Sequence, residues 1–248
     1  MDTLTIFSGK DKLGNKEEFD FVTFKKGNIY SIVGNTGSGK SRLIKDIEQF
    51  TNRDSVSNRK ILIDNKEVAI EERHSKSIEL VAHLSQNMRF VLDTSVKDFL
   101  NIHKECRKIP HIDINKIIET ANTITAEPIS LSQNLNSLSG GQTRALMIAD
   151  IAHICDNPII LIDEIENAGI DKIAALNALL KEDKLIFIVT HDSHTALMAD
   201  TRIIMKNGSI YKIIERSKEE ENLLDNLNEM YQLQLNYQSL LREGEYLI

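Results

Sequence analysis

Two unbroken runs of apolar residues stand out in the second half of the chain, at 159–162 and 185–189. A stretch with helical spacing, 171–180, separates them. Strands that are buried on both faces have continuous apolar runs of this kind, and parallel neighbours need a crossover connection between them. A third run, 29–33, has the same character. The pattern predicts an α/β fold with a mostly parallel core sheet.

Shorter strand-like segments predict an antiparallel β subdomain beside this core. The segments 4–7 and 19–24 precede the first parallel strand, and the pattern at 59–70 predicts a hairpin. Later in the chain, Asn207 and Gly208 lie between two apolar segments. An Asn-Gly pair in that setting is a strong signal for a hairpin turn.

The middle of the chain, 94–136, has its apolar residues at three- and four-residue spacing, which is typical of amphipathic helices. These positions are Val96, Phe99, Leu100, Ile114, Ile117, Ile118 and Ala121. We therefore expect one domain over 1–214, with an inserted helical subdomain at about 87–137.

The last segment, 215–248, is predicted to be a C-terminal helical extension. An apolar stripe follows one side of its helical wheel, although Gln234 interrupts it: Leu223, Leu227, Met230, Tyr237 and Leu241. The stripe either packs on the same domain or contacts a partner or second subunit.

Charge and hydropathy limit the class of protein. The net charge is -7, and the segment 215–248 has eight acidic and three basic residues, so about -2 remains for the body. This is not the basic surface expected of a dedicated nucleic-acid-binding protein. The longest apolar runs hold about five residues, whereas a membrane-spanning helix needs about 20. We expect a soluble, cytoplasmic protein, in which Cys106 and Cys155 are reduced structural thiols.

The run 29–33 leads into a segment that fits the pattern GxxxxGK(S/T) and precedes a helical stretch, 42–47. Its residues are Gly34, Asn35, Thr36, Gly37, Ser38, Gly39, Lys40 and Ser41. In a strand–loop–helix context, such glycines let backbone N–H groups point at phosphate oxygens, and the helix N-terminus adds a favourable dipole. The lysine can reach the outer phosphates, and the serine hydroxyl can hold Mg²⁺.

Two acidic residues, Asp163 and Glu164, follow the run 159–162. A buried parallel strand delivers such residues to the carboxyl edge of the sheet, where ligands of open α/β folds bind. One carboxylate there can position Mg²⁺, and the other can orient or deprotonate an attacking water. General-base assistance of this kind contributes about 10²–10⁴ in rate.

A second glycine-containing helix start lies at 138–142, before the helical run 143–151. Its residues are Leu138, Ser139, Gly140, Gly141 and Gln142. It is either a second anion-binding helix terminus or an ordinary N-cap with a flexible turn.

Five motifs in this order resemble those of ATP-binding-cassette (ABC) ATPases. They are GNTGSGKS at 34–41, Gln86 in LSQN, LSGGQ at 138–142, ILIDE at 160–164 and His191 in VTHD. The resemblance covers roughly residues 1–214. It implies a P-loop NTPase of the ABC cassette type that binds and hydrolyses ATP with Mg²⁺.

The resemblance also implies roles for individual residues. Lys40 and the glycine loop would hold the phosphates, and three oxygen-bearing side chains would meet Mg²⁺: Ser41, Gln86 and Asp163. Glu164 would be the catalytic base, and His191 would sense the γ-phosphate, with Gln86 completing the catalytic group.

One departure from the family pattern leaves a second candidate base. The segment 165–171 is one residue longer than the usual connection after the acidic pair. Glu166 therefore remains a rival to Glu164 as the base.

The resemblance further implies a homodimer. Members of the family act as head-to-tail dimers that close on two ATP molecules and open after hydrolysis. Ser139, Gly140, Gly141 and Gln142 would then contact the γ-phosphate of ATP bound to the opposite subunit. This agrees with the expectation that the two helix termini cannot face the same ATP from within one chain.

Three segments favour a particular client for the cassette. The segments 84–100, 143–153 and 162–171 look similar to the ATPase component of reactivases for adenosylcobalamin-dependent lysine or ornithine aminomutases. Such an ATPase would drive a conformational change in a protein client, either the aminomutase or a second reactivase subunit.

Two other functions fit the same motifs, because the fold alone does not identify the client. The chain could be the nucleotide-binding subunit of an ABC membrane transporter, which would bind membrane permease subunits. It could also be a DNA-structural ATPase. Those usually carry a long inserted coiled coil, whereas only 98 residues separate Lys40 from Leu138.

Overall fold

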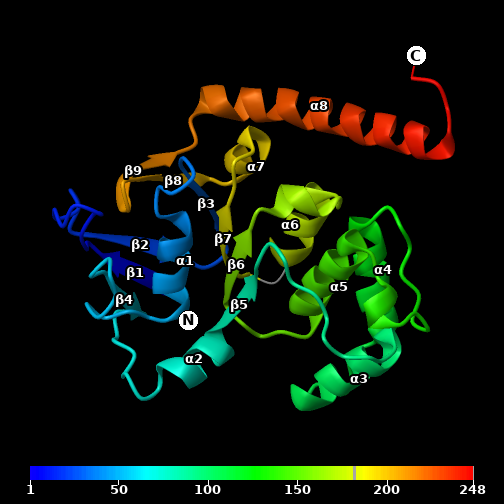
Figure 1. Cartoon of the computed structure of the whole chain (residues 1–248), viewed down its shortest axis with the longest axis horizontal. Helices are drawn as coiled ribbons and strands as arrows, with labels where there is room; N and C mark the ends of the chain where they lie inside the picture. The colour runs from blue at the N-terminus through cyan, green and yellow to red at the C-terminus, as the bar shows by residue number, and fades with distance from the viewer. Residues whose placement is uncertain (181–182, 248) are drawn as a thin grey trace.

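Two β-sheets organise the computed structural model of the chain, which describes residues 1–180 and 183–247 (Figure 1). In the larger sheet β5, β6, β7, β3 and β8 lie side by side in that order and are parallel, and β9 pairs antiparallel with β8. Its strands are β5 (Val81–Leu84), β6 (Ile159–Asp163), β7 (Leu185–Val189), β3 (Ile29–Val33), β8 (Thr201–Lys206) and β9 (Ser209–Glu215). The smaller sheet is antiparallel and consists of β2 (Phe21–Lys25), β1 (Thr3–Phe7) and β4 (Lys60–Ile63). The predicted α/β fold with an antiparallel layer is confirmed.

The helices of the described part of the chain join these strands. They are α1 (Lys40–Glu48), α2 (Arg73–Leu80), α3 (Val96–Cys106), α4 (Ile114–Ile124), α5 (Gly140–His153), α6 (Lys172–Leu180), α7 (Ser193–Met198) and α8 (Lys218–Glu243), with two short 3-10 helices, η1 (Leu135–Ser137) and η2 (Ile165–Ala168). Each is too short or too polar to span a bilayer.

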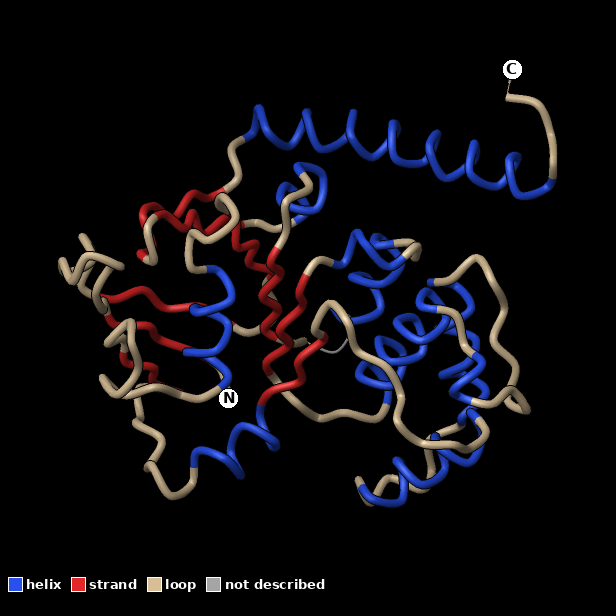
Figure 2. The backbone as a smooth tube through the Cα atoms, in the orientation of Figure 1, coloured by secondary structure: helices blue, strands red, loops and turns tan. Residues whose placement is uncertain are grey.

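The central strands send alternate side chains into two cores, because successive residues of a strand point to opposite faces. Ile160 and Ile162 of β6 pack among apolar side chains of α4, α5 and α6. Ile159 and Leu161 pack instead with α1 and the smaller sheet. The two faces of the larger sheet are therefore covered by different helices (Figure 2). As a result, α1 and α5 lie on opposite sides of it.

The helices predicted in the middle of the chain are confirmed as α3 and α4. The Ser95 hydroxyl caps α3 by accepting a hydrogen bond from Asp98 N. Val96 and Leu100 of α3 are fully buried in the same core as Ile117 of α4. The limits of the helical subdomain, at about 87–137, remain a prediction.

The predicted hairpin at 59–70 is only half correct. Its first arm is β4, but beyond the turn a single bridge joins Ile63 to Lys66, and no second strand follows. Asp64 explains the difference, because its carboxylate accepts hydrogen bonds from Asp2 N and Thr3 N at 2.8 Å. These bonds hold the turn to the start of β1, which is the strand that pairs with β4.

A buried ionic cluster joins the N-terminal loop, α1 and the turn between β8 and β9. The Arg59 guanidinium donates to Glu17 Oε1 at 2.6 Å and to Asp46 Oδ2 at 3.0 Å, and all three side chains are 0% exposed. Arg59 also donates to the backbone oxygen of Gly208 at 2.6 Å. The cluster therefore ties together segments that are far apart in the sequence.

The C-terminal extension forms one long helix, α8, which starts with a capping box between Ser217 and Glu220. None of its residues is buried, and it lies over α7 at the margin of the molecule (Figure 1). Met230 and Leu241 of the predicted stripe are 66% and 60% exposed. Residue 248 of the predicted extension, 215–248, lies outside the described residues, and what the stripe contacts stays a prediction.

Candidate active site

The glycine-rich loop connects β3 to α1 and is backed by the turn between β8 and β9. Gly39 has a φ of 107°, and a Cβ atom at this position would lie 2.8 Å from the Cα of Gly208. Gly208 N donates to Ser38 O at 2.7 Å. A larger residue at position 39 would therefore meet both a backbone penalty and a steric one. The loop follows the predicted strand–loop–helix order.

Lys40 is turned onto its own loop. Its Nζ donates to Gly34 O at 2.7 Å and to Asn35 O at 3.3 Å, and the residue is 7% exposed. Burial lowers the pKa of Lys40, and the charges of Glu164 and Asp163 act in the opposite direction. Lys40 thus lies close enough to the end of β6 to interact electrostatically with both carboxylates.

The other side chains of the loop differ in their exposure. The Ser38 hydroxyl is buried and has no hydrogen-bond partner. Asn35, Thr36, Gly37 and Ser41 are exposed. A buried hydroxyl without a partner is unfavourable in the absence of a ligand, because it has lost its water without compensation.

The acidic pair lies at the carboxyl end of β6, and Glu164 meets two other predicted residues there. Gln86 Nε2 donates to Glu164 Oε2 at 2.6 Å, and His191 Nε2 lies 3.6 Å from Glu164 Oε1. The backbone of Glu164 is left-handed, with a φ of 52°. Non-glycine residues rarely adopt this conformation, and such positions concentrate at functional sites. The structure thus brings the three predicted catalytic side chains together.

Glu166, the rival base, occupies a different position. Its Oε1 accepts hydrogen bonds from Thr190 Oγ1 at 2.7 Å and from His191 N at 3.1 Å. It therefore holds the segment that follows β7, whereas Glu164 faces the side chains of Gln86 and His191. The arrangement favours Glu164 as the group that can meet a water molecule.

The second glycine-containing segment forms the N-terminus of α5. Ser139 is its N-cap, and Ser139 and Gln142 exchange the two hydrogen bonds of a capping box. Ser139 and Gly140 are exposed. Gln142 is only 6% exposed, and its amide also donates to Pro128 O at 3.0 Å. In the single chain, the Gln142 side chain thus supports the helix terminus from inside, and the surface here is made by Ser139 and Gly140.

Arg144 was not singled out by the sequence, yet it connects α5 to the acidic strand end. Its guanidinium donates to Asp163 O at 2.7 Å and to Ser85 O at 3.2 Å. Burial lowers the pKa of Arg144, and the nearby Asp163 charge opposes this shift. The only signal in the sequence that could have identified Arg144 is a cation within an otherwise mostly apolar helical run.

A polar network that the sequence did not reveal connects the turn after β7 to α8. Lys172 Nζ donates to Asp192 Oδ2 at 2.5 Å and lies 4.7 Å from the ring centroid of Tyr231. The Tyr231 hydroxyl accepts from Lys172 N at 3.2 Å and donates to Ile170 O at 3.5 Å. Burial alone would raise the pKa of Asp192, but hydrogen bonds from Lys172 and Thr195 outweigh it and lower the pKa to about 2.

Comparison with known proteins finds relatives, one of which matches almost the whole chain. The family model described as ABC transporter matches residues 20–167. The chain is 46% identical, over 245 residues, to an uncharacterized ABC transporter ATP-binding protein of Methanocaldococcus jannaschii, and the match covers 98% of this chain and 94% of that protein. It is 30% identical over 212 residues to the energy-coupling factor transporter ATP-binding protein EcfA2 of Mycoplasmoides gallisepticum, covering 76% of this chain and 64% of that protein.

Solved structures show the same fold. CbiO1 of Clostridium perfringens, part of the ABC transporter complex cbiONQ, matches with a TM-score of 0.67 and 23% identity, covering 98% of this chain and all of that one. A dimeric ATP-binding cassette in a post-hydrolysis state with ADP and Pi matches with a TM-score of 0.59 and 20% identity, covering 86% and 98%. The chain belongs to the ABC transporter family, as an ATP-binding protein with the ATP-hydrolysing cassette of that family.

Proposed function

We propose that this chain is the nucleotide-binding subunit of an ABC membrane transporter, and that ATP hydrolysis at its cassette drives conformational change in permease subunits. The observation that carries the proposal is the 46% identity to an ABC transporter ATP-binding protein over nearly the full length of both chains. We place the ATPase domain at 1–214 and the C-terminal extension at 215–248. The chain would then work at the cytoplasmic face of the membrane.

The aminomutase reactivase hypothesis has weaker support. It rests on three sequence segments, and none of the relatives reported above is named for such a system. The transporter subunit is therefore the better supported hypothesis. The reactivase ATPase remains a prediction, which the recovery experiment described below also tests.

The proposed ATPase works as a pair of identical chains arranged head to tail. The glycine loop precedes α1, and Ser139 precedes α5, on opposite faces of the larger sheet. A second copy can present its exposed Ser139 and Gly140 to a nucleotide held by the first. The similar cassette solved with ADP and Pi is itself dimeric.

Residues of the loop and of the end of β6 fit ATP and Mg²⁺. The partnerless Ser38 hydroxyl and the inward-turned Lys40 are groups that a phosphate would satisfy. Ser41, Gln86 and Asp163 would hold Mg²⁺, which prefers oxygen ligands of this kind. When bound, the ion neutralises charge on the phosphate oxygens.

Glu164 is the proposed base for the attacking water. Gln86 donates to one of its oxygens and His191 lies beside the other, so the carboxylate is oriented before substrate arrives. Glu166 keeps the His191 backbone in place through a hydrogen bond of 3.1 Å. Pre-positioned groups of this kind lower the reorganisation that accompanies the chemical step.

Glu164→Gln tests the assignment of the base, with Glu166→Gln as its matched control. Glu164→Gln should slow ATP hydrolysis by about 10²–10⁴ and leave ATP affinity intact, so that an ATP-loaded dimer accumulates in light scattering. Glu166→Gln should retain a larger share of turnover. Loss of turnover in Glu166→Gln alone would reverse the two roles.

The transporter assignment has a separate test. Tagged protein, expressed in its own host, should be recovered with detergent-solubilised membranes and should bring a polytopic membrane protein in a fixed ratio. Recovery from the soluble fraction with a cobalamin-dependent enzyme, and without a membrane subunit, would favour the reactivase instead.

A further inference from the structure

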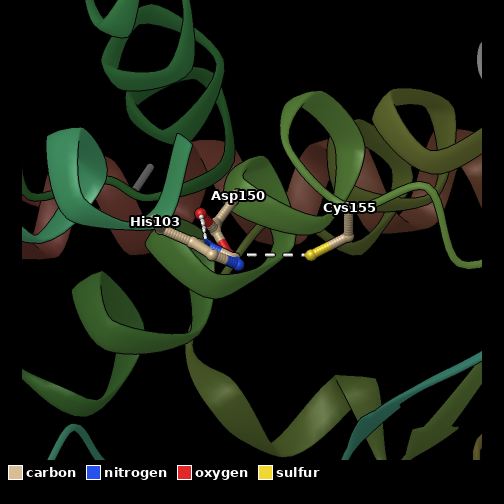
Figure 3. Close-up of side chains that lie close together, drawn as sticks. All are labelled: His103, Asp150 and Cys155. Carbon is tan, nitrogen blue, oxygen red and sulfur yellow. Dashed lines mark hydrogen bonds and ion pairs between the residues drawn. The ribbon is translucent and has the colours of Figure 1, made fainter. Parts of the chain in front are cut away.

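Three side chains of different chemistry converge at the far end of α5 (Figure 3). His103 comes from α3, Asp150 from α5, and Cys155 follows the end of α5. Spacing along the sequence gave no sign of them, because 47 residues separate the first from the second. We propose that His103, Asp150 and Cys155 form a binding site for a divalent transition-metal ion of the zinc class.

The geometry brings the three donor atoms within reach of a common ion. His103 Nδ1 lies 2.8 Å from Asp150 Oδ1, and Cys155 Sγ lies 3.9 Å from Asp150 Oδ2. One donor atom from each residue falls within 4.8 Å of the other two. Ligand atoms around a tetrahedral zinc ion are about 3.5 Å apart, from bond lengths of 2.0–2.3 Å. Side-chain rotations that move the outermost pair about 1 Å closer are enough to complete the set.

The donor set selects the class of metal. Imidazole nitrogen, carboxylate oxygen and thiolate sulfur together suit zinc and its neighbours, whereas calcium and magnesium take oxygen ligands. Asp150 and Cys155 are 7% and 8% exposed. One carboxylate and one thiolate together balance the two charges of the ion, as a buried ion requires.

The site has a route to solvent. Cys155 and the nearby Arg107 line a polar cavity of about 590 Å³ at the surface. Water from this cavity can supply the fourth ligand of a three-residue zinc site. Asp150 lies about 16 Å along α5 from Ser139, at a rise of about 1.5 Å per residue, and so is remote from the helix start proposed to meet nucleotide.

Two nearby cations, Arg107 and Lys184, limit the affinity of the cluster for a metal ion. Arg107 Nε donates a long hydrogen bond of 3.5 Å to His103 Nε2. This bond breaks if the Arg107 side chain moves towards the cavity. Lys184 Nζ donates to Cys155 O at 2.5 Å and to Ile151 O at 3.3 Å, so it also holds the segment that carries the thiol. Arg107→Gln should therefore bind metal more tightly than the wild type, because one repelling charge is gone.

Cobalt(II) is the spectroscopic probe, since thiolate-bound Co²⁺ absorbs in the near ultraviolet. Nucleotide-free, full-length protein should gain this band with one Co²⁺ per chain and lose it when Zn²⁺ is added. The band should be absent in Cys155→Ser. It should be unchanged in the control Cys106→Ser, which removes the other, exposed cysteine of the chain. His103→Gln should weaken Co²⁺ binding by about tenfold or more.

The results that overturn the proposal are equally specific. They are no thiolate band in the wild type, a band that survives in Cys155→Ser, or a band lost in Cys106→Ser. Should Cys155→Ser fail to fold, alkylation of the wild-type protein, continued until the buried Cys155 has reacted in the metal-free sample, gives an independent answer through mass-spectrometric readout of each cysteine. Zn²⁺ should slow the labelling of Cys155 and leave Cys106 unaffected, and equal labelling with and without Zn²⁺ would mean that the cluster is a hydrogen-bonded group only.

Discussion

Arg59→Met removes the cation at the centre of the buried cluster behind the phosphate loop. Arg59 donates to both oxygens of Glu17, to Asp46 and to Gly208 O, and the three charged side chains are fully buried. Methionine keeps much of the side-chain volume but leaves two carboxylates without this cation. Removing one partner of a buried ion pair costs about 3–5 kcal/mol. Because Asp46 keeps a hydrogen bond from Arg42, we expect about 4 kcal/mol.

Urea denaturation followed by circular dichroism measures this loss. With a slope of about 3 kcal/mol per molar urea, the midpoint should fall by roughly 1–1.5 M. Lys16→Met is the control, because it breaks an ion pair with Asp20 in the same region whose side chains are 70% and 87% exposed. Exposed pairs contribute little, so its midpoint should stay near that of the wild type. An Arg59→Met midpoint no lower than that of Lys16→Met would refute the reasoning.

Three further changes test the nucleotide loop and its surroundings. Lys40→Ala should weaken ATP binding by about 10–100-fold in calorimetry, because it removes a charged hydrogen bond, and unchanged affinity would contradict the phosphate-loop assignment. Tyr231→Phe keeps the ring beside Lys172 but removes the hydroxyl that joins α8 to Ile170 O and Lys172 N. If this link positions the segment that follows Glu164, kcat should fall while KM for ATP holds, and Tyr237→Phe, farther along α8, should behave as wild type. A kcat of Tyr231→Phe equal to that of Tyr237→Phe would disprove this positioning role. The pKa of Asp192 is about 2 in the folded chain, below about 3.9 when unfolded, so its stabilisation is present above pH 4 and is lost as the pH falls to 2. Asp192→Asn should flatten the decline of urea midpoints over that range, and identical slopes would count against this origin.

Local sequence patterns were enough to predict the elements that carry the nucleotide. The run 159–162 is buried on both faces. All four of its residues are therefore apolar, and this continuous run identified the strand. The phosphate loop was also predictable, because Gly39 meets a backbone requirement that no other residue satisfies as well. In both cases the signal lies within a short, continuous stretch of the sequence.

Long-range partnerships were beyond the same reasoning. Arg59, Glu17 and Asp46 look like ordinary surface charges in the sequence, since only the folded chain encloses them. The hairpin at 59–70 was predicted too long because Asp64 is held by the first residues of the chain. Gln142 also has a partner distant in the sequence that no motif revealed, because its amide donates to Pro128 O at 3.0 Å; its predicted contact with the γ-phosphate of the opposite subunit stays a prediction.

The contact between Gly39 and Gly208 has a consequence for how the protein is made. The loop proposed to bind phosphate leaves the ribosome early, but the turn between β8 and β9 behind it is among the last parts of the sheet to be synthesised. A nascent chain that ends before β8 has every residue of the glycine-rich motif and lacks the wall behind it. Nucleotide binding should therefore begin only when the hairpin of β8 and β9 has closed, which makes ATP a reporter of completed folding for this chain.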